Sequence, residues 1–268
     1  MKKIFIVALA TLLFVSSAFS SPVSESADNS LEYVVKKGVF VLGLDDSFPP
    51  MGFRDENNEI VGFDIDCARE VCKRLGVELK CQPIDWNAKE QELATKQIDC
   101  IWNGFTITPE RQEALTFSEA YVGNAQVIIV KSDSSIKTLS DLAGKAVGVQ
   151  AGSSGQVALE SSGDLYKSIK GEVEFKDFLT ALMDLEIGGV DAVVIDLFVA
   201  NFNIKDSGKS FRILEESLEA EEYGIGFRKG DEKLCTAVED ALKAMAKDGT
   251  LAQISTRWFG ADITTVGK

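Results

Sequence analysis

Short apolar runs alternate with amphipathic segments along most of the chain, and this alternation predicts an α/β fold. Residues 39–44, 77–83 and 98–102 have the length and composition of strands. Between them, residues 65–75 carry apolar side chains at helical spacing and end at a glycine, and residues 88–95 predict a short second helix. The first hundred residues therefore predict strand, helix, strand, helix, strand, which is the connectivity of a largely parallel sheet.

A second series of alternating elements follows, and two amphipathic helices then close the chain. The predicted elements of the second series are strands at 127–130, 146–149 and 190–195 and helices at 139–142, after 152–155 and at 178–185. The closing helices carry their apolar faces at residues 234–245 and 254–259. Two α/β units in a chain of 268 residues predict two lobes.

The first twenty residues have the composition of a secretory signal peptide. Two lysines precede an apolar stretch at residues 4–15, and Ala18-Phe19-Ser20 is a small-x-small cleavage motif. The apolar stretch is shorter than the ~20 residues of a membrane span, so a membrane anchor is the less favoured interpretation. We expect cleavage near Ser20, a flexible leader over residues 21–30 and a mature protein in the periplasm.

Composition narrows the classes of function. The chain has 28 basic and 42 acidic residues; loss of the signal peptide removes two lysines and no acid, so the mature charge is 26 minus 42, or −16. Nucleic acid repels so acidic a protein, and no nucleic-acid partner is expected. The chain contains no histidine, which excludes a Ser-His-Asp triad and a histidine-ligated metal. We therefore predict no catalytic residue, no metal and no cofactor.

Polar side chains follow four of the predicted strands. Ligands of open α/β sheets bind outside the carboxyl ends of the strands, so a cleft between two lobes can gather these side chains. The four clusters are Asp45-Asp46-Ser47, Asn103-Gly104-Phe105-Thr106, Gly152-Ser153-Ser154 and Asp196.

The charges near these strand ends suit a free amino acid. Arg111 offers a planar two-pronged donor for an α-carboxylate, and Asp196 offers a carboxylate for the ammonium from the other lobe. The turn at 152–154 opens a helix whose N–H groups can hold an anion, and Phe48 and Trp86 can flank the rest of the guest. Each residue also has a structural interpretation: Arg111 as a surface charge, Asp196 as a helix N-cap, the aromatic pair as core.

An ordered set of motifs resembles the extracellular solute-binding proteins, family 3, of polar amino-acid ABC transporters, a family that includes glutamine-, arginine- and lysine/ornithine-binding proteins. The motifs are Phe48-Pro49-Pro50, Val61-Gly62-Phe63-Asp64-Ile65-Asp66, residues 103–111, Phe117-Ser118-Glu119-Ala120-Tyr121, Tyr223-Gly224-Ile225 and Arg257-Trp258-Phe259-Gly260. The resemblance runs from about Leu31 to Gly260. It implies a periplasmic-binding-protein-like type II fold, in which two α/β lobes are joined by two hinge strands.

The resemblance also implies domain boundaries. Lobe 1 is discontinuous and comprises residues 31–122 and 223–268, and lobe 2 comprises residues 123–222. The hinges are expected near 121–125 and 219–223. Closure of the lobes over a guest then presents one closed form to a membrane permease.

By the same resemblance, the predicted residues take separate parts of the guest. Arg111 holds the α-carboxylate, helped by Thr106 and the Ser153-Ser154 turn, while Asp196 and the carbonyl of Gly104 take the α-ammonium. Phe48 and Trp86 flank the side chain, and Asp45 and Gln150 read its tip. The whole predicted ligand-binding set is Asp45, Phe48, Trp86, Asn103, Gly104, Thr106, Arg111, Gln150, Ser153, Ser154 and Asp196.

Two departures from the family pattern bear on the guest. Gln150 stands where some glutamine binders carry lysine, which favours a polar or cationic side chain beside Asp45. The Trp102-Asn103 pair is bulkier and more polar than usual, which leaves glutamine and cystine open.

The expected partners are a free amino acid of the glutamine, arginine/lysine or cystine class and, transiently, an ABC permease in the inner membrane, with the chain a monomer. The alternatives are a ligand sensor for a separate receptor and a secreted dehydratase of the same fold.

Overall fold

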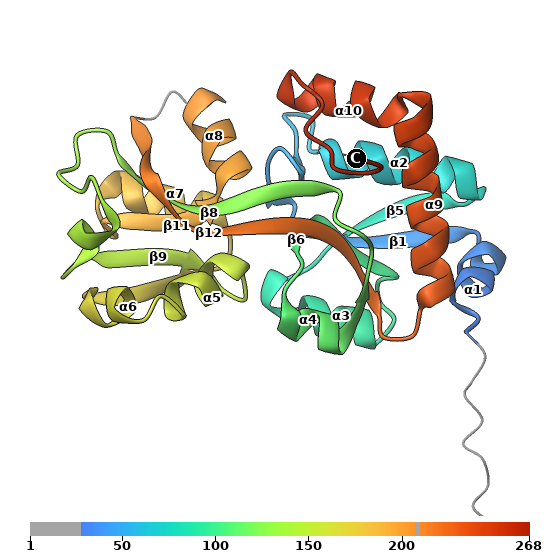
Figure 1. Cartoon of the computed structure of the whole chain (residues 1–268), viewed down its shortest axis with the longest axis horizontal. Helices are drawn as coiled ribbons and strands as arrows, with labels where there is room; N and C mark the ends of the chain where they lie inside the picture. The colour runs from blue at the N-terminus through green and yellow to red at the C-terminus, as the bar shows by residue number, and fades with distance from the viewer. Residues whose placement is uncertain (1–27, 207–209) are drawn as a thin grey trace, which may run out of the picture.

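The computed structural model describes residues 28–206 and 210–268. The predicted signal peptide, residues 1–20, and most of the predicted leader, residues 21–30, lie outside the described residues. Two lobes lie side by side, and two long strands, β8 (Val122–Lys131) and β12 (Phe211–Arg228), run between them (Figure 1). A search of the described helices for one long and apolar enough to cross a membrane finds none.

In the part of the chain that the structure describes, one nine-stranded sheet extends through both lobes. Its order is β10-β9-β11-β8-β12-β6-β1-β5, with β7 beside β12. β1 pairs in parallel with β5 and β6, and β9 pairs in parallel with β10 and β11, whereas β8 and β12 run antiparallel to their neighbours. The strands are β1 Val39–Leu44, β5 Glu78–Pro83, β6 Cys100–Thr106, β7 Leu115–Phe117, β9 Ala146–Gln150, β10 Gly171–Phe175 and β11 Ala192–Asp196; a separate small sheet contains β2 Ser47–Phe48, β3 Gly52–Arg54 and β4 Ile60–Val61.

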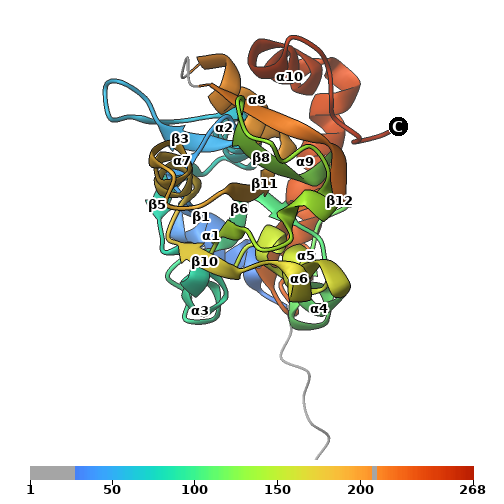
Figure 2. The ribbon, with the colours of Figure 1, turned by 90° about the vertical axis from the view of Figure 1, so that its left-hand side faces the viewer.

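Helices cover both faces of this sheet, as the view along the long axis shows (Figure 2). In the first lobe they are α1 Ser30–Lys37, α2 Phe63–Leu75, the 3₁₀ turn η1 Trp86–Ala88, α3 Lys89–Ala94, α4 Pro109–Ala114, α9 Glu232–Asp248 and α10 Thr250–Phe259. In the second they are η2 Leu139–Leu142, α5 Ser154–Glu160, α6 Asp164–Ser168, α7 Phe178–Ile187 and α8 Leu197–Asp206. The predicted alternation over the first hundred residues is confirmed by β1, α2, β5, α3 and β6.

The apolar spacing of the helices explains how they cover the sheet. On α9, Leu234, Val238, Leu242 and Met245 fall on one face and are almost fully buried. Gly249 then adopts a left-handed conformation with φ +83°, which ends α9 and lets α10 begin. The predicted break between the two closing helices is therefore confirmed.

The lobes are joined by the paired part of β8 and β12 and by aromatic contacts. The ladder between these strands includes Val122 opposite Tyr223 and Gln126 opposite Glu219. Ring pairs also bridge the lobes: Phe48–Phe178 at 5.7 Å, Phe53–Phe202 at 5.5 Å and Phe198–Phe259 at 5.1 Å between centroids. The lobes therefore share apolar surface as well as backbone.

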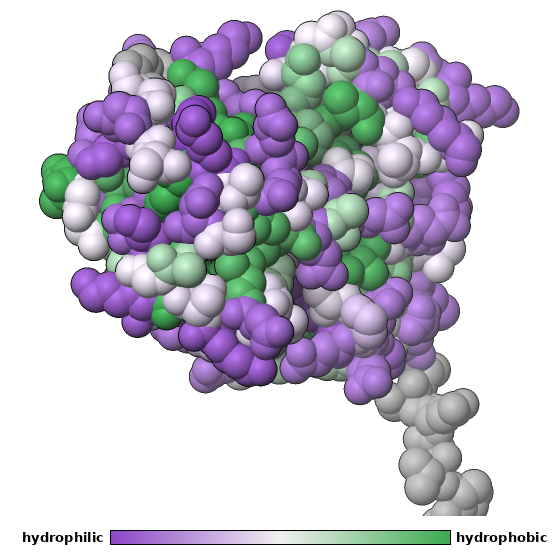
Figure 3. All heavy atoms as spheres, turned by 60° about the vertical axis from the view of Figure 1, so that its left-hand side comes forward, coloured by the Kyte–Doolittle hydropathy of each residue, from purple (hydrophilic) through white to green (hydrophobic). Residues whose placement is uncertain are grey.

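The outer surface on the side of the second lobe is largely hydrophilic (Figure 3). Hydrophilic residues cover most of the face that includes the second lobe, and hydrophobic residues form smaller groups between them (Figure 3). Charged side chains on such a face stay solvated, and a net charge far from zero keeps protein molecules apart.

Candidate functional site

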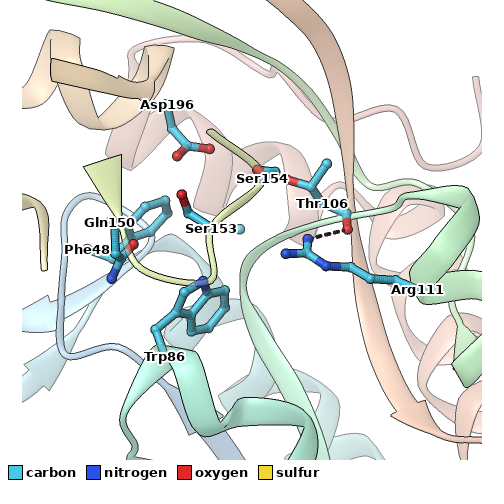
Figure 4. A pocket seen from close by; sticks show the side chains of 9 residues that line it. Phe48, Trp86, Thr106, Arg111, Gln150, Ser153, Ser154 and Asp196 are labelled. Atoms are coloured by element: carbon cyan, nitrogen blue, oxygen red, sulfur yellow. Dashed lines mark hydrogen bonds between the residues drawn. The ribbon is translucent and has the colours of Figure 1, made fainter. Parts of the chain in front are cut away.

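A narrow pocket lies between the lobes and is lined by nine of the eleven predicted binding residues. Its cavity volume is about 10 Å³, roughly the room that one water molecule needs. The two lobes therefore lie close together around the pocket, and it must widen to admit a small guest. The lining residues are Phe48, Trp86, Gly104, Thr106, Arg111, Gln150, Ser153, Ser154 and Asp196, and Figure 4 shows their side chains converging from several elements.

The strand ends explain this convergence. β6 ends at Thr106, β9 ends at Gln150 and β11 ends at Asp196, so three strands deliver polar side chains to the same cleft. Ser153 caps α5, because its hydroxyl oxygen accepts a hydrogen bond from the N–H of Gln156 at 3.0 Å. The placement inferred from strand ends therefore matches the geometry of the pocket.

Arg111 is held in place by its own lobe and reaches the other. Its Nη1 donates to the Thr106 carbonyl at 2.9 Å, its guanidinium lies 4.5 Å from the centre of the Phe105 ring, and its Nη2 lies 3.4 Å from the Gly152 carbonyl of the second lobe. Burial lowers the pKa of the guanidinium, which Glu90, Glu221 and Asp196 oppose. The group remains a cation, and a fixed planar donor of this kind recognises a carboxylate.

Asp196 stands at the opposite end of the pocket and is almost fully buried. Its Oδ1 accepts hydrogen bonds from the Tyr223 hydroxyl at 2.5 Å and from Asn124 Nδ2 at 2.8 Å. Burial and the neighbouring Glu221 carboxylate raise the pKa of Asp196 well above its usual range. The pocket thus places an acidic group of one lobe opposite a cationic group of the other.

Gly104 lines the pocket with its backbone. It adopts φ +56°, and a Cβ at this position would lie 2.8 Å from the Phe48 ring. The buried carboxylate of Asp64 accepts a hydrogen bond from the Gly104 N–H at 2.7 Å, which fixes the peptide. Burial raises the pKa of Asp64 to about 7. Asp64 was singled out in the sequence only as part of a motif, and its contact with Gly104 is what connects it to the site.

Asp45 and Asn103 belong to the site without lining the pocket. Asp45 Oδ2 accepts a hydrogen bond from Gln150 Nε2 at 2.7 Å, and Asn103 Oδ1 accepts one from the backbone N–H of Asp45 at 3.0 Å. Burial raises the pKa of Asp45 to about 6. Asp45 therefore holds Gln150, and Asn103 holds the backbone of Asp45. Asp45 also borders a neighbouring space that Lys176 and Asp177 of the other lobe line.

Lys89 is a residue of the cleft that sequence reasoning missed. Its side chain is almost fully buried, and its Nζ donates to the Gly152 carbonyl of the other lobe at 2.9 Å and to the Trp86 carbonyl at 3.2 Å. Burial lowers the pKa of its ammonium to about 8. Nothing in the local pattern separates Lys89 from the exposed lysines, because its burial depends on the approach of the second lobe.

We predict that Lys89→Met changes the dependence of stability on pH. The unfolded chain keeps the ordinary lysine pKa of ~10.4, so between about pH 8 and that value it binds a proton that the folded protein has released. The free energy of unfolding of the wild type should therefore rise relative to the variant across this interval, by roughly 1–3 kcal/mol. Urea denaturation at several pH values measures this difference. The exposed Lys80→Met serves as a control that should follow the wild type, and parallel profiles for wild type and Lys89→Met would contradict the prediction.

Comparison with known proteins identifies the family. Residues 40–261 match the family model of the bacterial extracellular solute-binding proteins, family 3. The L-cystine-binding protein TcyJ of Escherichia coli (strain K12) is 34% identical over 96% of each chain, and the arginine-binding extracellular protein ArtP of Bacillus subtilis (strain 168) is 31% identical over 94% of this chain and 97% of its own. The crystal structure of an ABC uptake transporter substrate-binding protein from Streptococcus pneumoniae with bound histidine has a TM-score of 0.87 at 37% identity, covering 90% of this chain and 99% of that one, which confirms the predicted type II fold. This chain belongs to the bacterial extracellular solute-binding proteins, family 3.

Proposed function

We propose that this protein is the substrate-binding component of an amino-acid ABC importer and binds a free polar or cationic L-amino acid between its lobes. The observation that carries the proposal is that Arg111 of one lobe and Asp196 of the other line a single small pocket. A free amino acid carries a carboxylate and an ammonium on one carbon. Only a closed cleft lets such a guest contact both groups, so binding shifts the protein towards the closed form.

Each part of the proposed guest has a complementary group in the pocket. The α-carboxylate binds Arg111, with the hydroxyls of Thr106 and Ser154, which lie 3.0 Å apart across the lobes, beside it. The α-ammonium binds Asp196 and the carbonyl of Gly104. Since the named relatives bind cystine and arginine and a similar structure holds histidine, the guest is of the glutamine, arginine/lysine or cystine class.

The side chain of the guest lies between Phe48 and Trp86, both of which are more than nine-tenths buried. Its tip points towards Gln150 and the Asp45 that holds it. An acidic group at that end favours a cationic or hydrogen-bond-donating tip. Because Asp45 already accepts from Gln150, a guest that replaces this bond with its own donor is favoured over an aliphatic one.

The remaining parts of the proposal follow from the family and the N-terminal sequence. The protein acts outside the cytoplasm, in a periplasm, after cleavage near Ser20, and meets an inner-membrane ABC permease transiently as a monomer. It performs no chemistry on its guest; its matched relatives are binding proteins. Incubation with candidate substrates, followed by a search for turnover, separates binding from the dehydratase alternative.

A thermal-shift screen of the mature chain, beginning at residue 21, tests the proposal. We expect at least one of L-arginine, L-lysine, L-glutamine, L-histidine and L-cystine to stabilise the protein, by about 2.7 kcal/mol at a concentration 100-fold above its Kd. The methyl ester and the des-amino analogue of the same compound are the controls, since each lacks one of the two charges. Equal stabilisation by these analogues, or none by the whole panel, would refute the proposal.

A further inference from the structure

Glu221, on β12, adjoins Asp196 and was not among the predicted site residues. Asn124 Nδ2 donates to Asp196 Oδ1 at 2.8 Å and to Glu221 Oε1 at 2.6 Å, so the two carboxylates meet around one amide nitrogen. Gln126 Nε2 donates to the same Glu221 oxygen at 2.9 Å. Asn124 and Gln126 both lie on β8, so both strands that join the lobes contribute to this group of side chains.

Four further titratable side chains lie around the pair, on β12, α4 and α3. Tyr223, on β12, donates its hydroxyl to Asp196. Arg111, on α4, is close enough for Asp196 and Glu221 to influence its own titration. On α3, Lys89 and Glu90 lie next to Arg111 with opposite charges, and their own N–O distance is 3.3 Å.

Asp196 is almost fully buried and Glu221 is half-buried, so two full negative charges in contact are disfavoured here. Arg111 is close enough to both carboxylates for them to influence its titration, but it is also near Glu90. Two carboxylates in contact inside a protein titrate as a unit, and the second ionisation is strongly disfavoured. In keeping with this, burial and the Glu221 carboxylate raise the pKa of Asp196 well above its usual range.

We propose that Asp196 and Glu221 hold one proton between them in the guest-free protein, and that the α-ammonium of the guest displaces this proton on binding. The displacement step rests on the proposed function. The O–H bond of the shared acid breaks, its electron pair stays on the carboxylate, and the proton goes to water. An N–H of the ammonium then donates to the carboxylate in its place. Glu221 is thus a positioning residue that acts through Asp196.

The structure provides a way out for the proton. A groove of about 680 Å³ adjoins the pocket, and its lining includes Glu221, Thr106, Arg111 and Ser154. Thr106, Arg111 and Ser154 also line the pocket. Solvent in the groove therefore reaches the Glu221 side of the pair while Asp196 faces the guest.

The first experiment needs no guest. The carboxyl carbons of the mature, ¹³C-labelled protein are followed by NMR from pH 4 to 9, with Asp196→Asn to assign the signal of Asp196. We expect Asp196 to titrate well above the usual range of an aspartate in the wild type and clearly lower in Glu221→Gln. The Glu221→Gln variant keeps an amide oxygen that can accept from Asn124 and Gln126, so it should remain folded. The matched control is Glu222→Gln, which removes an exposed acid from the next position of β12.

The second experiment measures the displaced proton. Binding of L-arginine, L-glutamine and L-cystine is measured by calorimetry at pH 6–8 in phosphate and in Tris, whose ionisation enthalpies differ. For each compound that binds, we expect close to one proton released by the wild type and by Glu222→Gln, clearly fewer by Glu221→Gln, and a wild-type affinity that rises up to tenfold per pH unit.

The outcomes separate the two proposals. An Asp196 that is already ionised at pH 5, or that titrates alike in wild type and Glu221→Gln, overturns the shared proton whether or not a guest binds. Binding without proton release overturns the displacement step and leaves the proposed function standing. Failure of every compound to bind overturns the proposed function, and with it the displacement step, while the NMR titration still decides whether the pair holds a proton.

Discussion

Arg111→Ala should weaken the binding of the amino acid by roughly 30-fold to several-thousand-fold. Loss of one partner of a desolvated charge pair costs about 2–5 kcal/mol, because the carboxylate of the guest is then buried without its counter-charge. The side chain is fixed by the Thr106 carbonyl and the Phe105 ring, so little ordering is left for the guest to induce. Calorimetry with the compound found by the thermal-shift screen measures the change.

Two further variants make this result specific. Arg111→Lys keeps the charge and removes the planar fork, and it should recover only part of the affinity. Arg69→Ala removes an exposed arginine of α2, which bonds only with Asp66 in the described structure, and should bind like the wild type. If Arg111→Ala kept its affinity within about threefold of the wild type, the guanidinium would not belong to the site, and the proposed orientation of the guest would be wrong.

Gly62→Ala should destabilise the fold by about 3 kcal/mol or more. Gly62 precedes α2 with φ +143° and ψ +171°, a region that costs other residues about 1–3 kcal/mol. A Cβ there would lie 2.2 Å from the carbonyl oxygen of Met51 and 2.9 Å from the Cα of Gly52, and backbone atoms cannot move aside as a side chain can. Urea denaturation gives the loss as a lower midpoint with an unchanged slope.

The other end of the same helix supplies the control. Gly76 also has a positive φ, +72°, but a Cβ there meets nothing within 4 Å. Gly76→Ala should therefore cost only the ~1–2 kcal/mol of a left-handed alanine. If the two variants lost the same free energy of unfolding, the clash with Met51 would have to be relieved in Gly62→Ala. The backbone conformation would then account for the whole loss in each variant.

The apolar runs and helical spacings were enough to place most core elements, because these elements bury one face against a common sheet. The middle of β12 could not be predicted from apolar runs or spacings. This part, residues 215–222, has the sequence EESLEAEE and no run of buried side chains, because the strand joins two lobes rather than lying under a helix. Without an apolar face, a strand has no periodicity for the sequence to reveal. Glu221 lies in this segment and was missed for the same reason.

The candidate site also contains some residues that the sequence predicts and others that it does not. Residues at the ends of buried strands, such as Gln150 and Asp196, were predictable because topology brings strand ends together. Lys89 and Asp64 were not assigned to the site, because their roles depend on contacts with residues 63 and 40 positions away in the sequence, at Gly152 and Gly104. Asn103, which was predicted as a binding residue, accepts a hydrogen bond from the backbone N–H of Asp45 and does not line the pocket, and its contact with the guest stays a prediction.

Because aromatic rings bridge the lobes, closure of the lobes should change the heat capacity of the protein. Separation of the lobes would expose the facing rings of Phe53 and Phe202 and of Phe198 and Phe259 to water. Hydration of apolar surface carries a large positive heat capacity. Reburial of these rings therefore makes the heat-capacity change of binding more negative than burial of the guest alone would make it. Capture of the guest therefore becomes more exothermic as the temperature rises, even though none of these four rings lines the pocket.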